Sequence, residues 1–172
     1  MARLPVQVLF GLALPALCLG AQPGAAQVEP FGRWQQPLRR CALVPQGAPA
    51  QRCLAVQLDQ RTAEVVRLTL QVDGPGRGQQ MQLILVGALT GGSEPMACAA
   101  GGCSLRKPLQ LQLISLSQAR LDGRGLAQTL PHTLPVQGTC RITPADLHCE
   151  VMDRSGTSLS AAPTWRVDAQ MN

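Results

Sequence analysis

Six of the seven cysteines lie beyond residue 40, and their type and spacing make them the first candidates for chemistry. They form three local couples, each of which encloses residues that are common in turns. An even number of cysteines in an exported chain favours disulfides over free thiols. The sequence alone leaves other pairings open, but the spacing favours three local disulfides, which are Cys41–Cys53, Cys98–Cys103 and Cys140–Cys149.

Cys98 and Cys103 enclose the spacer Ala-Ala-Gly-Gly, which invites comparison with redox and metal motifs. Redox enzymes favour Cys-x-x-Cys at a helix start, whereas this spacer is longer and contains two glycines that start helices poorly. A structural zinc site combines characteristic ligand couples, and only His132 and His148 could add imidazoles here. The sequence therefore favours a structural disulfide, with redox and metal roles as the alternatives.

The Cys140–Cys149 pair has the most support from residue alternation. Cys140 shares a strand face with Ile142, and Cys149 shares one with Leu147 and Val151. Since side chains alternate along a strand, a hairpin of these two segments would place both sulfur atoms on its apolar face, across from each other.

Residues for acid-base or nucleophilic catalysis do not form a recognisable set. His132 lies between prolines, His148 alternates outward beside Glu150, and no Gly-x-Ser-x-Gly elbow is present. Glu150 and Asp153 are too close in sequence to face each other across a glycan cleft. We therefore predict no catalytic, cofactor-binding or metal-binding residue and no cofactor, and the sequence leans against an enzyme.

Two glycine-rich segments resemble ligand loops but fit turns better. The segment "GPGRGQQ" lacks the Gly-Lys-Ser/Thr ending of a phosphate loop and lies between strands, so a hairpin loop is predicted. The segment "LDGRG" lacks the alternating acidic ligands of a calcium loop, so a turn is predicted there.

The N-terminal segment has the features of a secretory signal peptide. Arg3 precedes a short apolar run, and Gly24 and Ala26 suit cleavage after Ala26. The run is short and contains prolines, so we expect no transmembrane segment in the mature chain. A lipoprotein anchor at Cys18 would require a small residue where Leu17 stands. The sequence predicts a periplasmic or secreted protein with residues 1–26 removed.

The composition of the mature chain argues against nucleic acid as a partner. Loss of Arg3 with the signal lowers the net charge from +5 to +4, and the arginines are scattered among acids. Single-strand binders stack bases on aromatic side chains, but the mature chain has no tyrosine and retains only Phe31, Trp34 and Trp165. We expect a core of leucine, valine and alanine. The excess of arginine over lysine suggests a bacterial genome rich in GC.

Alternating apolar and polar residues predict short strands through most of the chain. The clearest segments are 66–73, 109–117, 134–142, 147–153 and 164–171, separated by glycine and proline turns. Residues 81–89 are apolar on both faces and predict a central strand. Residues 117–130 could hold a short helix. We predict one all-β domain over residues 41–172, preceded by an extended lead-in at 27–40. The expected fold is a disulfide-stapled antiparallel β-sandwich or small barrel of about seven or eight strands.

One resemblance to a known family rests on "FGRWQQPLRRC", Cys53 and "EPMACAAGGCSL". Phe31, Gly32, Trp34, Cys41 and Cys53 resemble the start of exported bacterial proteins of the invasion-associated locus B type. Cys98 and Cys103 resemble that family's later cysteine pair. The gap from Trp34 to Cys41 is longer than in the family, and Cys140 and Cys149 have no counterpart. The resemblance covers about half of the chain and implies a disulfide-stabilised β-sandwich of the envelope without catalytic residues.

These observations predict an exported bacterial β-domain that is a non-catalytic binding or structural component of the envelope or secreted fraction. The sequence does not identify its partner, and an envelope protein and a small apolar ligand are the two candidates. The alternatives are a lipocalin-like carrier of a small apolar ligand and a protein of the invasion-associated locus B type.

Overall fold

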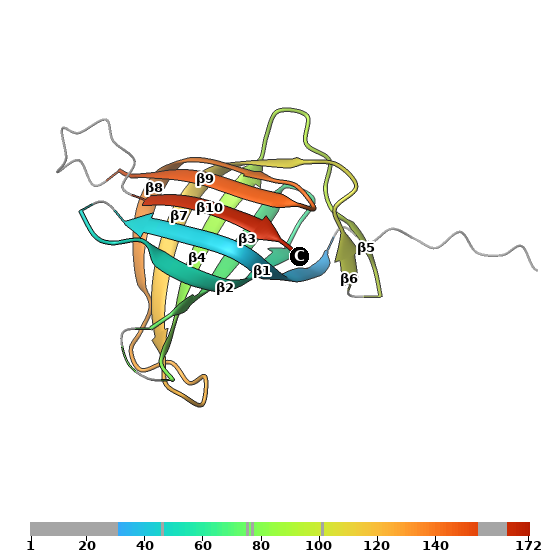
Figure 1. Ribbon diagram of the computed structural model, residues 1–172. Helices are drawn as coiled ribbons and strands as arrows, with labels where there is room; N and C mark the ends of the chain where they lie inside the picture. Colours follow the sequence, from blue (N-terminus) through green and yellow to red (C-terminus); the bar gives the residue numbers. More distant parts are fainter. Residues whose placement is uncertain (1–30, 46, 75, 77, 101, 155–164) are drawn as a thin grey trace, which may run out of the picture.

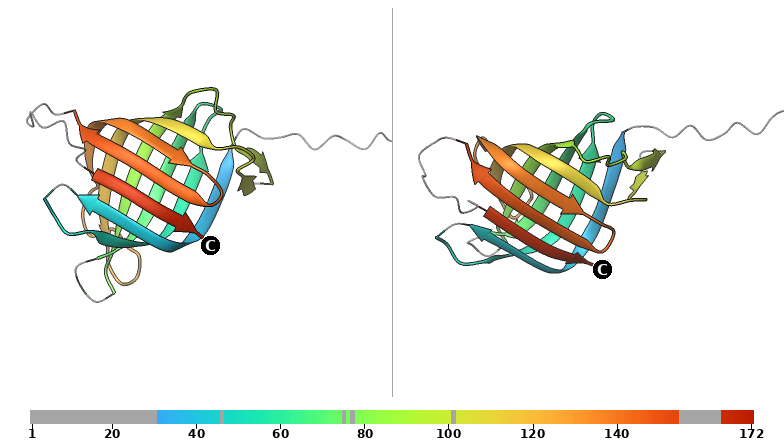
Figure 2. Two further views of the ribbon diagram at one scale, coloured as in Figure 1. Left: turned by 45° about the horizontal axis from the view of Figure 1, so that its top comes forward. Right: turned by 90° about the horizontal axis from the view of Figure 1, so that it is seen from above.

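Eight antiparallel strands of the protein close into a barrel (Figure 1). The computed structural model describes residues 31–45, 47–74, 76, 78–100, 102–154 and 165–172. The barrel strands are β1 (Gly32–Pro45), β2 (Gln51–Gln60), β3 (Val65–Asp73), β4 (Gln80–Leu89), β7 (Leu109–Leu121), β8 (His132–Ile142), β9 (Asp146–Asp153) and β10 (Trp165–Met171). Two short strands, β5 (Ala97–Ala99) and β6 (Gly102–Ser104), form a hairpin beside the barrel (Figure 2).

Pairing between the first and last strands closes the barrel. Consecutive barrel strands pair as antiparallel neighbours from β1 to β10, and β10 then pairs with β1 from Leu38↔Met171 to Pro45↔Trp165. Figure 2 shows β10 lying between β9 and β1. Closure leaves these two strands without the unpaired edges that an open sheet would present. The expectation of a sandwich or small barrel is thus confirmed as a barrel.

The alternation seen in the sequence fills the interior with aliphatic side chains. On β3 the side chains of Val66, Leu68, Leu70 and Val72 have no exposed surface, and they face inward. Leu85 on β4 is equally buried. Small barrels of this strand number have an interior just wide enough for side chains to fill. Leucine and valine side chains from the barrel strands therefore make up most of the core.

The segment between β4 and β7 covers one end of the barrel. Met96, Cys98 and Leu105 in this segment are at most 9% exposed and pack into the same core as the barrel strands. The backbone N–H of Met96 also donates a 2.7 Å hydrogen bond to the side-chain oxygen of Gln60, which is itself buried. This end is closed by apolar contacts and by a buried polar link.

Three disulfides connect neighbouring strands. Cys41–Cys53 joins β1 to β2, Cys140–Cys149 joins β8 to β9, and Cys98–Cys103 lies across the β5–β6 hairpin. Cys53, Cys140 and Cys149 are at most 2% exposed, so their sulfur atoms belong to the barrel core. Three disulfides in one domain are typical of proteins in an oxidising, extracytoplasmic environment.

The turn between β8 and β9 forms where the sequence predicts it, whereas residues 32–40 and 117–130 differ from expectation. Thr143 N donates to Asp146 O at 2.8 Å, which confirms the turn between β8 and β9. Residues 32–40, expected in the lead-in, instead form the first part of β1, because Gln35 and its neighbours pair with β2. The short helix expected within 117–130 is absent from this described segment. Residues 117–121 extend β7, and the glycines at 123 and 125 lie in the turn that follows.

No helix in the described ranges has both the length and the apolar character needed to cross a membrane.

Gly138 allows β8 to approach β9 closely and supplies the first test of the fold. Its φ is +143°, and a Cβ at this position would collide with the carbonyl oxygen of Glu150. We expect Gly138→Ala to destabilise the protein by about 1 to 3 kcal/mol, because L residues rarely adopt this backbone conformation. Chemical denaturation measures the change. Gly123→Ala is the control, since its nearest contact would be an ordinary 3.5 Å; equal stability of both variants would contradict the prediction.

Removal of the Cys140–Cys149 disulfide provides the second test. The bridge closes a loop with a sequence separation of 9. We expect the double variant Cys140→Ala, Cys149→Ala to lose on the order of 2 to 3 kcal/mol of unfolding free energy, through the wider freedom of the unfolded chain. Peptide mapping of the unreduced wild type should show three local bridges and no free thiol among the six cysteines. A mixed connectivity, or an undiminished stability of the variant, would argue against this assignment.

Candidate functional site

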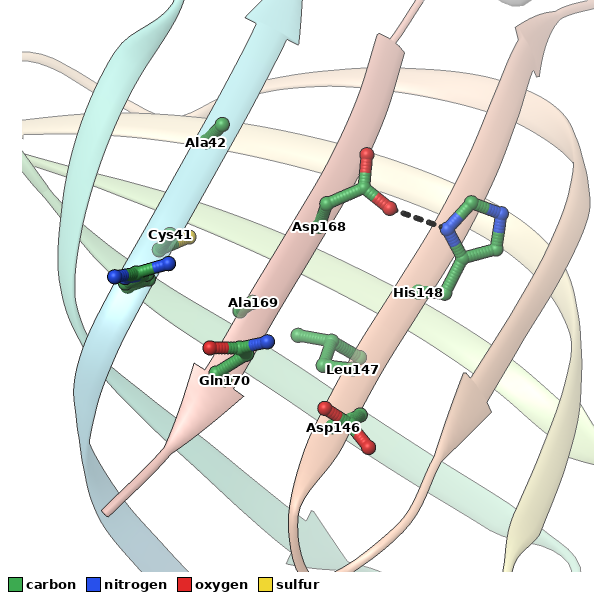
Figure 3. A pocket seen from close by; sticks show the side chains of 9 residues that line it. Cys41, Ala42, Asp146, Leu147, His148, Asp168, Ala169 and Gln170 are labelled. Carbon is green, nitrogen blue, oxygen red and sulfur yellow. Dashed lines mark hydrogen bonds and ion pairs between the residues drawn. The ribbon is translucent and has the colours of Figure 1, made fainter.

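The outer wall of β1, β10 and β9 carries an open pocket of about 420 Å³, which we call the outer-face pocket (Figure 3). Ala42, Asp168 and His148 lie opposite one another on these three strands, so they form one row across the outside of the barrel. The small side chain of Ala42 leaves the pocket hollow between longer neighbours. The lining residues are Arg40, Cys41, Ala42, Asp146, Leu147, His148, Asp168, Ala169 and Gln170.

Charged side chains in and beside the outer-face pocket form a connected network. His148 Nδ1 lies 2.5 Å from Asp168 Oδ1, as the dashed line in Figure 3 marks. His148 Nε2 lies 3.8 Å from Glu150 Oε1, and Arg166 Nη2 lies 3.5 Å from the same oxygen. All four side chains are about half exposed. The network therefore orients the imidazole while leaving it accessible to a partner.

The pairing of His148 with Asp168 resembles two members of a catalytic triad. Such a dyad activates a nucleophile that lies within hydrogen-bond reach of the imidazole. The described residues that line the pocket include no serine or threonine, and the sulfur of Cys41 is held in a disulfide. The groups present are suited to polar and ionic contacts with a bound molecule.

A second hollow, which we call the mouth pocket, lies at the barrel end opposite the segment between β4 and β7. Its lining residues are Gln51, Arg52, Asp73, Gly74, Met81 and Arg120, and its volume is about 420 Å³. Met81 faces Val72 on one side and Arg120 on the other, so Arg120 belongs to an inward-facing row. Gln118 and His132 likewise lie opposite each other, and Gln118 also faces the buried Leu83. Inward positions thus change from apolar to polar at this end.

The two histidines weighed in the sequence lie far apart in the barrel wall. His132 begins β8 at the mouth, whereas His148 lies on the outside of β9. No three histidine, cysteine, aspartate or glutamate side chains gather as a possible metal site anywhere in the described ranges. The predicted cleavage position at Ala26 lies outside these ranges.

The two glycine-rich segments form turns around their own polar groups. Asp122 Oδ1 accepts hydrogen bonds from the backbone N–H groups of Arg124 and Leu126, both at 2.9 Å. The hydrogen bond from Leu126 has the largest effect, and together these bonds hold the pKa of Asp122 below its ordinary value. In the other segment Gly74 N donates to Gln79 O at 2.9 Å, which closes the hairpin between β3 and β4. The turn prediction is confirmed for "LDGRG" and, in the other segment, for the described residues that pair across the hairpin loop.

Arg33 and Asp59 form an ion pair across β1 and β2. Arg33 Nε lies 2.8 Å from Asp59 Oδ1, and Gln57 donates to the other carboxylate oxygen at 2.8 Å. Burial works to raise the pKa of Asp59. The hydrogen bonds from Arg33 and Gln57, with the positive charges of Arg33 and Arg61, outweigh it and lower that pKa below its ordinary value. This pair fixes the first part of β1 onto β2.

The structure defines the protein as a closed, eight-stranded antiparallel β-barrel with two additional strands and three disulfides. No protein-family model matches the chain, and neither a curated protein nor a solved structure matches it. The resemblance to the invasion-associated locus B type implied a β-sandwich, whereas the pairing of β10 with β1 closes a barrel. Membership of that family stays a prediction. The fold and the two pockets carry the functional argument.

Sequence reasoning did not identify Asp168, Gln51 or Arg120 as site residues. Asp168 lies 20 positions after His148, and only the β9–β10 register brings the two together. One signal for Arg120 was present, because β7 continues its alternation past Ser117 with polar residues on the face that Leu116 occupies. The expectation of a short helix within residues 117–130 obscured this alternation.

The ion pair at Asp59 predicts a pH-dependent loss of stability. Because its folded-state pKa is lowered, ionised Asp59 stabilises the fold above its ordinary pKa of 3.8, and this contribution is lost as the pH falls through the lowered value. We expect Asp59→Asn to cost about 0.5 to 1.5 kcal/mol at pH 7, and the gap from wild type to close in more acidic solution. Denaturation curves across pH, with Asp146→Asn as control, measure this. A gap that persists undiminished well below pH 3.8 would contradict the assignment.

Proposed function

We propose that this protein is a non-catalytic binding component of the bacterial envelope or secreted fraction and that it recognises a partner protein through the outer-face pocket. The single observation that carries the proposal is the exposed network of His148, Asp168, Glu150 and Arg166 beside the small Ala42. Opposite charges held in place on a rigid wall favour selective docking, because they penalise partners of the wrong charge pattern.

The barrel itself supports a scaffold role for this recognition. Strand β10, which carries Asp168, is paired on both sides, with β1 and with β9. A disulfide links β1 to β2, and another links β9 to β8. Side chains on such a wall lose little conformational freedom on binding, which lowers the entropic cost of association.

Export is the second part of the proposal. The predicted signal peptide at residues 1–26 supports it, and three disulfides in the folded chain are consistent with an oxidising compartment. The resemblance to exported proteins of the invasion-associated locus B type would place this chain in the same compartment.

The alternative prediction is a lipocalin-like carrier of a small apolar ligand. A carrier of this type would hold its ligand inside the barrel. Leu58, Leu68 and Leu85 have no exposed surface and occupy that interior, which favours recognition on the outside.

A site-specific cross-linking experiment tests the proposed recognition surface. A photoreactive amino acid replaces Gln170 in the outer-face pocket, or Gln71 on the outer face of β3 as the control, in protein produced in its native bacterium. We expect one defined cross-linked protein from position 170 and none from position 71. Asp168→Asn should reduce that cross-link by about tenfold, as expected for a charge-assisted contact.

Other outcomes of this experiment would redirect the assignment. Equal cross-linking from both positions, or none from position 170, would contradict recognition at the outer-face pocket. A lipophilic molecule that co-purifies stoichiometrically in native mass spectrometry would instead favour the carrier.

A further inference from the structure

Polar groups in the mouth pocket have binding capacity that the fold does not use. The side-chain oxygen of Gln51 is buried and accepts no hydrogen bond from another described residue. Within the described ranges, Arg52, Arg120 and Asp73 take part in none of the ion pairs of the protein. A buried acceptor without a partner is uncommon in folded proteins and calls for an explanation.

Four adjacent barrel strands bring these groups together. Gln51 and Arg52 begin β2, Asp73 ends β3, Met81 lies near the start of β4 and Arg120 lies near the end of β7. Leu43 pairs with Gln51 and has no exposed surface, so Gln51 belongs to an inward-facing row. Arg120 pairs with Met81, and Met81 pairs with the inward-facing Val72, so Arg120 lies on the same inward row. An acceptor oxygen, an apolar wall and a guanidinium therefore converge on one space.

The chemistry of these groups selects a class of ligand. Guanidinium groups bind carboxylates through paired charge-assisted hydrogen bonds. Asp73 adds a negative charge to the same pocket, which disfavours ligands with two negative charges. Gln51 Oε1 accepts hydrogen bonds, so it favours a ligand with an O–H or N–H donor. The volume of about 420 Å³ suits a small molecule.

We propose that the mouth pocket binds a small monocarboxylate that carries a hydroxyl or amino group beside its carboxylate. Arg120 holds the carboxylate, Gln51 Oε1 accepts from the hydroxyl or amino group, and Met81 contacts the carbon chain. This site is distinct from the outer-face pocket, so its failure would leave the proposed protein partner untouched.

A titration of the oxidised, exported protein followed by amide NMR tests this inference. Lactate and alanine carry the donor, whereas propionate has the same number of carbon atoms without it. We expect saturable shifts around Gln51 and Arg120, with lactate or alanine binding at least about fivefold more tightly than propionate because of the additional hydrogen bond.

Three variants separate the contributions. Arg120→Gln should weaken lactate binding by about tenfold or more, since it removes the charge-assisted contact. Arg141→Gln removes the same charge from the outer face of β8 and should leave binding unchanged. Gln51→Leu removes the acceptor and should abolish the preference for lactate over propionate. Well-dispersed amide spectra verify that each variant folds.

The inference is overturned if no ligand in the panel gives saturable shifts, or if the shifts gather at the outer-face pocket. Equal weakening by Arg120→Gln and Arg141→Gln would show a general charge effect and would also overturn it. If Arg120→Gln does not fold, Gln51→Leu decides the matter, because an unchanged preference for lactate excludes the proposed contact.

Discussion

The pairing of β10 with β1 is the interaction on which the rest of the structure depends. An eight-stranded meander that stayed open would expose two strand edges and the apolar face of every strand to water. Closure satisfies the edge hydrogen bonds and removes the inward leucines and valines from water in one step. The disulfides act on the same region, since Cys41–Cys53 and Cys140–Cys149 link strand pairs on either side of β10.

A barrel filled by its own side chains restricts binding to its outside and its ends. Leu68, Leu85 and the other inward aliphatic residues leave little opportunity for polar groups in the middle of the barrel. The end near Met96 is covered by the segment between β4 and β7. Polar inward residues consequently appear at the mouth, where Gln51 and Arg120 lie, and charged residues gather on outward rows such as that of His148. Both candidate sites follow from this distribution.

Local turn chemistry in the sequence agreed with the final architecture in most places. The turn at Thr143 and the loop around Asp122 use their own side chains to satisfy backbone groups, and short-range rules describe such turns well. The helix expected near residues 117–130 failed for a physical reason. Leu116, Gln118 and Arg120 continue the inward face of β7, and pairing with β4 outweighs the weak local preference of this segment.

By itself, the sequence determined an all-β chain with alternating strands, polar turns and cysteines in local couples, because each of these features depends on residues close in sequence. Only the tertiary structure decided between sandwich and barrel, since closure depends on β1 and β10 meeting from opposite ends of the described chain. The same long-range register placed Asp168 beside His148 and Arg120 beside Met81. Period-two alternation defines which face a residue occupies but carries no information about the neighbouring strand.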